Sequence, residues 1–205
     1  MRYAAKILIP VLVWLVFGLS ATTASATLSA EDKAQVARIE AYLNTINTMQ
    51  ARFLQIDAGG GVALGDVYMR RPGRMRFEYE PPAQILVVAD GIWLVFRDNE
   101  INETTRLPLY STPVSVLLQE DIQLSGDVTV TKVENDAKAL RVTVVDTENP
   151  DEGSITLVFS DNPMKLRQWL VTDAQGNVTS ISISNMQKNV TLRNELFTFF
   201  DSDYE

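Results

Sequence analysis

The chain of 205 residues contains neither cysteine nor histidine. Without cysteine it cannot have the disulfide framework of a small secreted module, nor a lipid-bearing N-terminal cysteine. Without either residue it cannot build a Cys/His zinc site, a Cys–His nucleophile pair or a Ser-His-Asp triad. Carboxylate-based hydrolysis and acidic calcium sites are not excluded. Because disulfides are impossible, the fold must be held together by an ordinary hydrophobic core.

Positive charge is also scarce, with 18 lysines and arginines against 26 acidic residues and a formal net charge of −8. Removing the first 26 residues would take away Arg2 and Lys6 but no acid, which leaves a net charge of about −10. An acidic surface repels phosphate backbones, so we expect no nucleic-acid partner. The local exceptions are Arg70, Arg71, Arg74 and Arg76.

The long apolar run of the chain lies at its N-terminus. Ile7 to Leu19 follows the basic Arg2 and Lys6 and precedes the A-x-A pattern of Ala24 to Ala26. This predicts a secretory signal peptide over residues 1–26, cleaved after Ala26, because the run is short for a membrane span. An uncleaved N-terminal anchor is the alternative. Residues 27–205 show no repeat, low-complexity tract or linker, which favours a single domain.

Two helices are predicted. Leu28 to Asn47 reads as one amphipathic helix, with Ser29 and Asp32 as a capping box and an apolar stripe at 3–4 spacing. The stripe consists of Val36, Ile39, Leu43 and Ile46. Within 108–120, Thr112-Pro113 is typical of a helix start and would place Val114, Leu117 and Leu118 on one face.

From Met49 onward apolar and polar residues mostly alternate, which is the period of a β-strand. The first predicted strand begins at Met49. The later ones are 62–71, 74–80, 85–89, 92–97, 100–106, 128–133, 140–146, 154–160, 166–172 and 178–186. About ten closely spaced antiparallel strands predict a strongly curved sheet or barrel. The two helices would cover its inner face. Periodicity does not decide whether that interior is packed or hollow.

The segment from Gly65 to Glu80 predicts a hairpin that turns at Pro72-Gly73. Arg71 has the same parity as Val67 and Met69, so it should point toward their apolar face. A buried guanidinium needs acceptors, because an unpaired buried charge is unfavourable. The ordinary alternative is an ion pair with Asp66, Glu78 or Glu80.

The chain contains in order the motifs G-D-V-Y-M-R-R-P-G-R-M-R-F-E-Y, I-L-V-V-A-D-G-I-W-L-V-F and T-P-V-S-V-L-L, and later G-S-I-T-L-V-F, L-R-Q-W-L-V-T-D-A-Q-G and E-L-F-T-F. Together these motifs resemble the LolA family of periplasmic carriers for outer-membrane lipoproteins, particularly its alphaproteobacterial forms. Each motif alone is weak, but their order and spacing are fairly specific. The resemblance covers essentially all of the chain after residue 26.

The resemblance implies a mainly β fold, an unclosed antiparallel half-barrel with an α-helical lid over a hydrophobic cavity. It implies that Arg71 binds the lid backbone in the closed form and is needed to pass the cargo on. The matching lid positions are Leu43, Leu117 and Leu118. The acyl-chain cavity is then expected to be lined by Val36, Ile39, Phe53, Val67, Met69, Met75, Phe77, Leu86, Trp93, Val95 and Val114.

The resemblance further implies a monomeric, non-enzymatic chaperone in the periplasm, without cofactor or metal. Its partners would be acylated lipoproteins, an inner-membrane lipoprotein-releasing ABC transporter, and an outer-membrane acceptor or the outer membrane itself. Two alternatives stay open: a module that senses lipidated or misfolded envelope proteins, and a carrier of another lipid. A third, a hydrolase using a pair such as Asp90 and Glu78, needs a defined carboxylate separation in a cleft.

Overall fold

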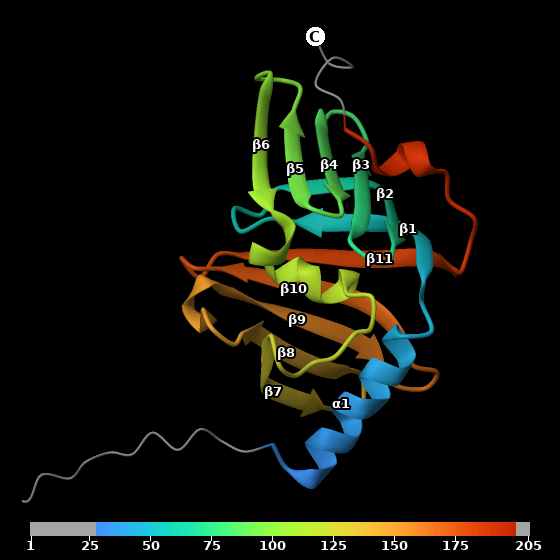
Figure 1. The fold of residues 1–205 in the computed structure, drawn as a ribbon, viewed down its shortest axis with the longest axis vertical. Helices are drawn as coiled ribbons and strands as arrows, with labels where there is room; N and C mark the ends of the chain where they lie inside the picture. The colour runs from blue at the N-terminus through green and yellow to red at the C-terminus, as the bar shows by residue number, and fades with distance from the viewer. Residues whose placement is uncertain (1–27, 200–205) are drawn as a thin grey trace, which may run out of the picture.

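The computed structural model describes residues 28–199, which form one antiparallel sheet with short helical segments (Figure 1). In these residues the sheet has eleven strands in the order β6-β5-β4-β3-β2-β1-β11-β10-β9-β8-β7. The strands are β1 Thr48–Ile56, β2 Val62–Arg70, β3 Arg74–Tyr79, β4 Ile85–Asp90, β5 Trp93–Asp98, β6 Glu103–Pro108, β7 Val128–Asn135, β8 Leu140–Asp146, β9 Gly153–Ser160, β10 Lys165–Asp173 and β11 Val178–Lys188. The helical elements are α1 Ala30–Leu43 and the 3₁₀ segments η1 Leu109–Ser111, η2 Pro113–Leu118, η3 Pro150–Glu152 and η4 Asn194–Phe197.

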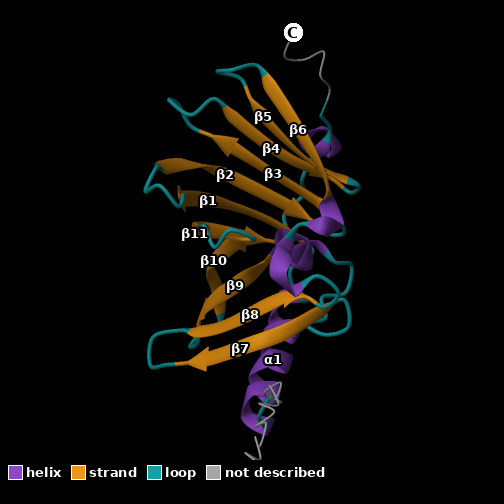
Figure 2. Cartoon of the chain, turned by 90° about the vertical axis from the view of Figure 1, so that its left-hand side faces the viewer, coloured by secondary structure: helices purple, strands orange, loops and turns teal. Residues whose placement is uncertain are grey.

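The sheet does not close into a barrel, because β6 and β7 are its two opposite edges. Strands that follow one another in sequence are hydrogen-bonded neighbours, except for β6 and β7, and β1 also pairs with β11, with Met49 opposite Lys188. The chain between β6 and β7 therefore has to cross from one edge to the other. Figure 2 shows α1 and the η1–η2 segment on the same side of the curved sheet. The prediction of an unclosed antiparallel half-barrel is confirmed.

The first helix is shorter than the predicted 28–47. Ser29 and Asp32 form the expected capping box, and the helix ends at the C-cap residue Asn44. Val36, Ile39 and Leu43 are its buried residues, as the 3–4 spacing predicts. The segment after Thr112 is helical as expected, but it is a 3₁₀ helix rather than an α-helix.

No helix among residues 28–199 is long and apolar enough to cross a membrane. The predicted signal peptide, residues 1–26, lies outside the described residues.

The concave face of the sheet is apolar and carries the main core. Side chains alternate between the faces along each strand, and directly paired residues on neighbouring strands share a face. Phe53 packs edge-to-face on Phe77 and Tyr79, with ring centroids 5.1 and 5.0 Å apart. A Cβ on Gly65 would lie 2.6 Å from the Phe53 ring, so the glycine lets this ring lie against the sheet.

The convex face carries a second apolar layer under the segment 189–199, which we call the strap. Its Phe197 is only 2% exposed. Nη1 of Arg70 donates to Oδ1 of Asn194 at 2.8 Å, and the guanidinium lies 4.7 Å from the Phe197 ring centroid. Nη1 of Arg76 donates to the carbonyl of Leu196 at 3.3 Å. The strap thus covers the back of β3 and β4, and two of the clustered arginines hold it there.

An apolar concave face under a latched lid

The lid consists of α1 with residues 44–46 that follow it, and of the segment 109–124, which contains η1 and η2 and leads from β6 toward the edge strand β7. Both parts lie on the concave side of the sheet (Figures 1 and 2). The segment crosses the sheet because it must join opposite edges, and its apolar side chains become buried there. From this segment the core includes Leu109, Val116, Leu117, Leu118, Ile122 and Leu124.

Arg71 lies at the β2–β3 turn and connects the sheet to both parts of the lid. Nε donates to the carbonyl of Ile46 at 2.8 Å, and Nη1 donates to Oδ1 of Asn44 at 3.0 Å. Two longer bonds of 3.4 Å run from Nη1 to the carbonyl of Gln119 and from Nη2 to the carbonyl of Asn44. The planar guanidinium has five N–H donors, so one side chain can bridge several acceptors at once.

Asn44 is the second residue of this latch, and the sequence did not single it out. Its Oδ1 accepts from the backbone N–H of Ile122 at 2.9 Å as well as from Arg71, and its Nδ2 donates to the carbonyl of Ile122 at 3.0 Å. Glu40 adds a further tie, accepting from the N–H of Leu124 at 2.7 Å. The end of α1 is therefore bonded to the crossing segment. A helix C-cap followed by polar residues is too common a pattern to predict such a role.

Gly73 extends the latch through the backbone. Its N–H donates to the carbonyl of Leu118 at 2.8 Å. Its φ is +75°, a left-handed value that favours glycine. A Cβ at this position would lie 2.8 Å from the Cα of Gly91, so the turn packs against the β4–β5 turn as well as the lid.

The acceptors of Arg71 are carbonyls and an amide, so the alternative of an ion pair with Asp66, Glu78 or Glu80 was wrong. Asp66 and Glu80 pair with Arg52, at 3.2 and 2.6 Å, while Glu78 pairs with Arg76 at 2.6 Å. Burial lowers the pKa of Arg71 from its ordinary value, and the nearby Asp121 opposes this effect. The charge is thus held by neutral groups of the lid.

Most of the residues predicted for the lid and cavity meet in one cluster. The main core contains Val36, Ile39, Leu43, Phe53, Val67, Met69, Met75, Phe77, Leu117 and Leu118, and Val114 is partly buried against it. Val116 and Trp169, which the sequence does not place in the cavity, are buried in the same core, and a core position is what the sequence favours for Trp169. Trp169 lies near Phe77, with ring centroids 6.3 Å apart.

Three predicted cavity residues were wrong, because they lie on the convex face. Val87 and Leu94 pack against the main core, and alternation then turns Leu86, Trp93 and Val95 to the other side. Trp93 is 43% exposed there. β4 and β5 are apolar on both faces, and the strap covers the back of β4. An apolar pattern on both faces does not reveal which face borders the lid.

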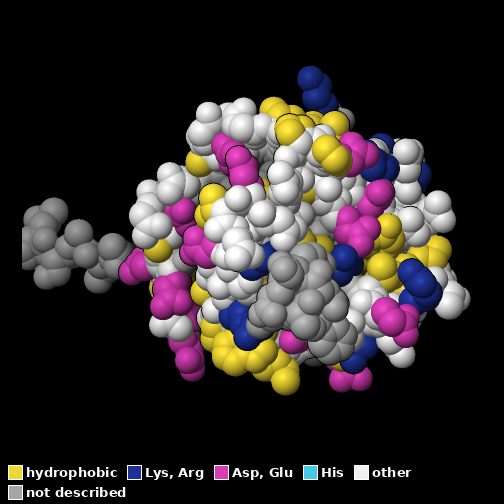
Figure 3. All heavy atoms as spheres, turned by 90° about the horizontal axis from the view of Figure 1, so that it is seen from above, with side chains coloured by type: hydrophobic (Ala, Val, Ile, Leu, Met, Phe, Trp, Pro, Cys, Tyr) yellow, Lys and Arg dark blue, Asp and Glu magenta, His cyan; other side chains and the backbone are white. Residues whose placement is uncertain are grey.

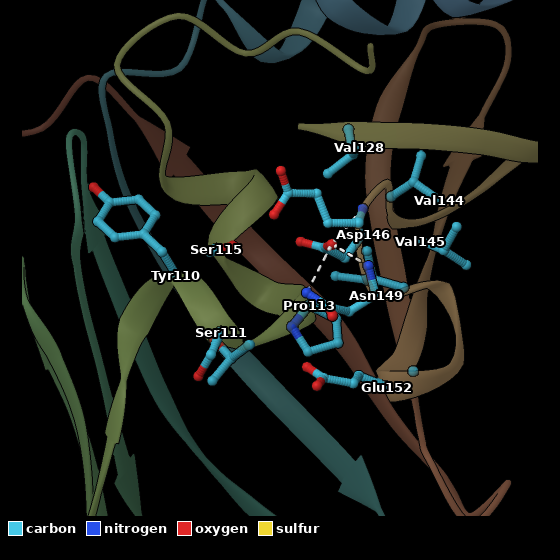
Figure 4. Close-up of a pocket in the computed structure, with 14 residues that line it drawn as sticks. Tyr110, Ser111, Pro113, Ser115, Val128, Val144, Val145, Asp146, Asn149 and Glu152 are labelled. Atoms are coloured by element: carbon cyan, nitrogen blue, oxygen red, sulfur yellow. Dashed lines mark hydrogen bonds between the residues drawn. The ribbon is translucent and has the colours of Figure 1, made fainter. Parts of the chain in front are cut away.

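The centre of the concave face is filled by side chains in this closed form. Ile39 and Leu118 of the lid and Val67 of the sheet have no exposed surface. A hollow of about 300 Å³ remains at the rim, between the η1–η2 part of the lid and β7–β9 (Figure 4). It has an apolar side with Val128 and Val144. A ligand larger than this hollow could reach the concave face under the lid only if the lid moved.

The lid leaves one part of the concave face uncovered, at β5 and β6. Phe96 and Leu107 lie on that face, opposite Val87 and Leu94, and are 41% and 48% exposed. The end of the molecule formed by β3–β6 is seen from above in Figure 3, where apolar side chains reach the surface beside charges of both signs. Apolar surface is therefore accessible next to the closed lid.

The carboxylates considered for hydrolysis do not face one another in a cleft. Oδ1 of Asp90 accepts from the N–H groups of Ile92 and Trp93, both at 2.8 Å, and Glu78 is ion-paired with Arg76. Asp90 is paired with Arg74 and Glu78 with Leu86, so the two acids lie four residues apart along the β3–β4 ladder.

The comparisons with known proteins agree with one another. The family model described as "Outer membrane lipoprotein carrier protein LolA" matches residues 44–200. Outer-membrane lipoprotein carrier proteins of Nitrosomonas europaea and Methylobacillus flagellatus are 31% and 29% identical, each over 80% of this chain and 84% and 83% of their own lengths. A crystal structure of a DUF1329 family protein from Desulfovibrio piger has a similar fold, with a TM-score of 0.51, 13% identity, and coverage of 85% of this chain and 99% of that one.

Proposed function

The chain belongs to the LolA family of outer-membrane lipoprotein carrier proteins, and we propose that it binds the acyl chains of lipoproteins released from the inner membrane and carries them to the outer membrane. The observation that carries the proposal is the apolar concave face under a lid that Arg71 holds closed. A soluble carrier needs apolar surface for acyl chains and a way to hide that surface when empty. A lid that opens when the bonds of Arg71 break, and closes when they form again, would meet both needs.

The latch would also favour release of the cargo. Burial of one CH₂ is worth about 0.8 kcal/mol, so one long acyl chain gains on the order of 10 kcal/mol in an apolar site. A carrier that kept this whole free energy of binding would not release its cargo. Each charge-assisted bond that the lid regains on closing is worth about 1.5–3 kcal/mol and competes with the cargo. Arg71 would thereby favour release.

The partners follow from this route. We propose that the carrier receives its cargo from an inner-membrane lipoprotein-releasing ABC transporter and gives it to an outer-membrane acceptor or to the outer membrane itself. It would act in the periplasm as a monomeric, non-enzymatic chaperone, after cleavage of the signal peptide behind Ala26. Leu43, Leu117 and Leu118 would move with the lid. Phe53, Met69, Met75 and Phe77 would form the wall that the acyl chains contact.

The test is to purify the protein from its own cell envelope and to identify bound material by mass spectrometry. Acylated lipoproteins, enriched over the same preparation from cells lacking the gene, are the expected result. A bound envelope protein without acyl chains would instead support the sensor alternative. Free lipids alone would support a carrier of another lipid.

A further inference from the structure

A second hollow, which shares no lining residue with the first, lies where α1 meets β10 and β11. It has a volume of about 540 Å³ and is bounded by Tyr42 of α1, by the start of β10 and by the end of β11. Its lining comprises Tyr42, Met164, Lys165, Leu166, Arg167, Ile183, Ser184, Asn185, Met186 and Lys188. No acidic side chain is among these residues, although acids outnumber bases in the chain as a whole.

The three cations of this hollow are not neutralised by neighbours. Within residues 28–199, Lys165, Arg167 and Lys188 form no ion pair. Nζ of Lys188 makes only a long 3.5 Å bond to Oγ1 of Thr45 and lies 4.9 Å from the Tyr42 ring centroid. Three positive charges around one concave site create a local potential that attracts an anion.

Apart from the cations the lining is mixed, with apolar side chains, the polar Ser184 and Asn185, and the hydroxyl of Tyr42. Met164, Met186 and Ile183 supply thioether and aliphatic surface, and methionine adapts to irregular ligands. The hydroxyl oxygen of Tyr42 accepts from the N–H of Leu166 at 3.1 Å, which positions the ring. Its own proton is free to be donated, and burial raises the pKa of Tyr42, so the hydroxyl stays protonated at neutral pH.

We propose that this hollow binds the phosphate-bearing headgroup of an anionic phospholipid, with Lys165, Arg167 and Lys188 on the phosphate and the methionines beside the lipid's glycerol and first methylenes. A free phosphate would use the cations but not the apolar wall, so the amphiphile fits the lining better. The site lies beside the last turn of α1, so a membrane-bound headgroup would hold the lid helix at the lipid surface. This inference goes beyond lipoprotein carriage and is tested on cargo-free protein.

The test compares two triple variants that remove the same charge. Lys165→Gln, Arg167→Gln and Lys188→Gln together empty the hollow of cations. The matched control is Lys33→Gln, Lys138→Gln and Arg193→Gln, which also removes two lysines and one arginine that are exposed and form no ion pair in the described part of the chain. Binding is measured by co-sedimentation with vesicles of phosphatidylglycerol and phosphatidylcholine, and with phosphatidylcholine alone. Circular dichroism verifies that both variants are folded.

The expected result is that the hollow variant binds the phosphatidylglycerol vesicles about tenfold or more weakly than the parent, while the control stays within about twofold. Vesicles of phosphatidylcholine alone should bind neither. Equal losses in both variants would overturn the proposal, because binding would then follow overall charge. It would also fail if the parent protein bound inorganic phosphate but not the phosphatidylglycerol vesicles, since the ligand would then be free phosphate.

Discussion

Arg70 and Arg71 are adjacent in the sequence but bind opposite sides of the sheet. Arg71 donates to Ile46 and Asn44 of the lid on the concave side, whereas Arg70 donates to Asn194 of the strap on the convex side. Alternation at the end of β2 divides the two side chains between the faces. One turn therefore fixes both covers of the sheet, and the two arginines should have separable effects.

Replacing Arg71 should uncouple loading from transfer. The Arg71→Leu variant loses its bonds to the lid, each worth about 1.5–3 kcal/mol, so the cargo-bound form gains relative to the closed form. We expect acylated lipoprotein to load normally and to transfer to outer-membrane vesicles at least about tenfold more slowly. Arg74→Leu removes the same charge from the same turn and serves as the control. Normal transfer by Arg71→Leu would rule out the latch.

Removing the side chain of Asn44 should loosen the lid from the other end. Asn44→Ala leaves the N–H and carbonyl of Ile122 without their partners, at a loss of about 1–3 kcal/mol. Hydrogen exchange should show faster exchange of the Ile122 amide. The exposed Asn47 is the control, because Asn47→Ala keeps the backbone carbonyl that accepts from the Arg71 N–H. Unchanged exchange in Asn44→Ala would mean that the crossing segment is held by packing alone.

A comparison of two glycines should isolate the packing of the latch turn. Gly73 and Gly126 both have positive φ, +75° and +83°, but only Gly73 has a backbone neighbour where a Cβ would lie. Gly126→Ala should lose about 1–2 kcal/mol from conformational strain. Gly73→Ala should lose more, because the β2–β3 turn must also move away from Gly91. Thermal unfolding measures both, and equal losses would exclude a packing contribution at Gly73.

The alkaline limit of stability should depend on Tyr79. Burial raises the pKa of Tyr79 to about 12, and the hydrogen bond to Gln55 acts in the opposite direction. The unfolded chain ionises first, near pH 10, so the stability from this residue is complete below pH 10 and is lost as the pH rises to about 12. Denaturant unfolding should show that Tyr79→Phe abolishes roughly 2–3 kcal/mol of this fall. The exposed Tyr110→Phe should leave the fall unchanged.

The two tryptophans of the described chain should report the two faces separately. Trp169 is 1% exposed in the main core, whereas Trp93 lies on the convex face. Acyl chains carrying bromine should quench the fluorescence of a Trp93→Phe variant, which retains Trp169, and should quench a Trp169→Phe variant much less. Strong quenching of Trp93 would place the cargo on the convex face and contradict the proposed site.

Much of the fold could be predicted from the sequence because its signals are local. Alternation identified the strands, and the capping box at Ser29 fixed the start of α1. The parity of Arg71 correctly directed it toward the apolar face, where it binds the lid. The role of that contact in cargo release stays a prediction. The type of the η2 helix and the end of α1 were less predictable, since tertiary contacts decide where short helices end.

The sequence by itself determined an acidic chain without cysteine or histidine, a curved antiparallel sheet, and an arginine pointing to its apolar side. Only the tertiary structure decided which face each apolar strand residue occupies, because β4 and β5 carry apolar residues on both faces, and β4 is covered by the core on one side and by the strap on the other. It also decided that Arg71 meets Asn44 and lid carbonyls rather than a carboxylate. These contacts join residues far apart in the chain, and neither composition nor periodicity carries information about such pairs.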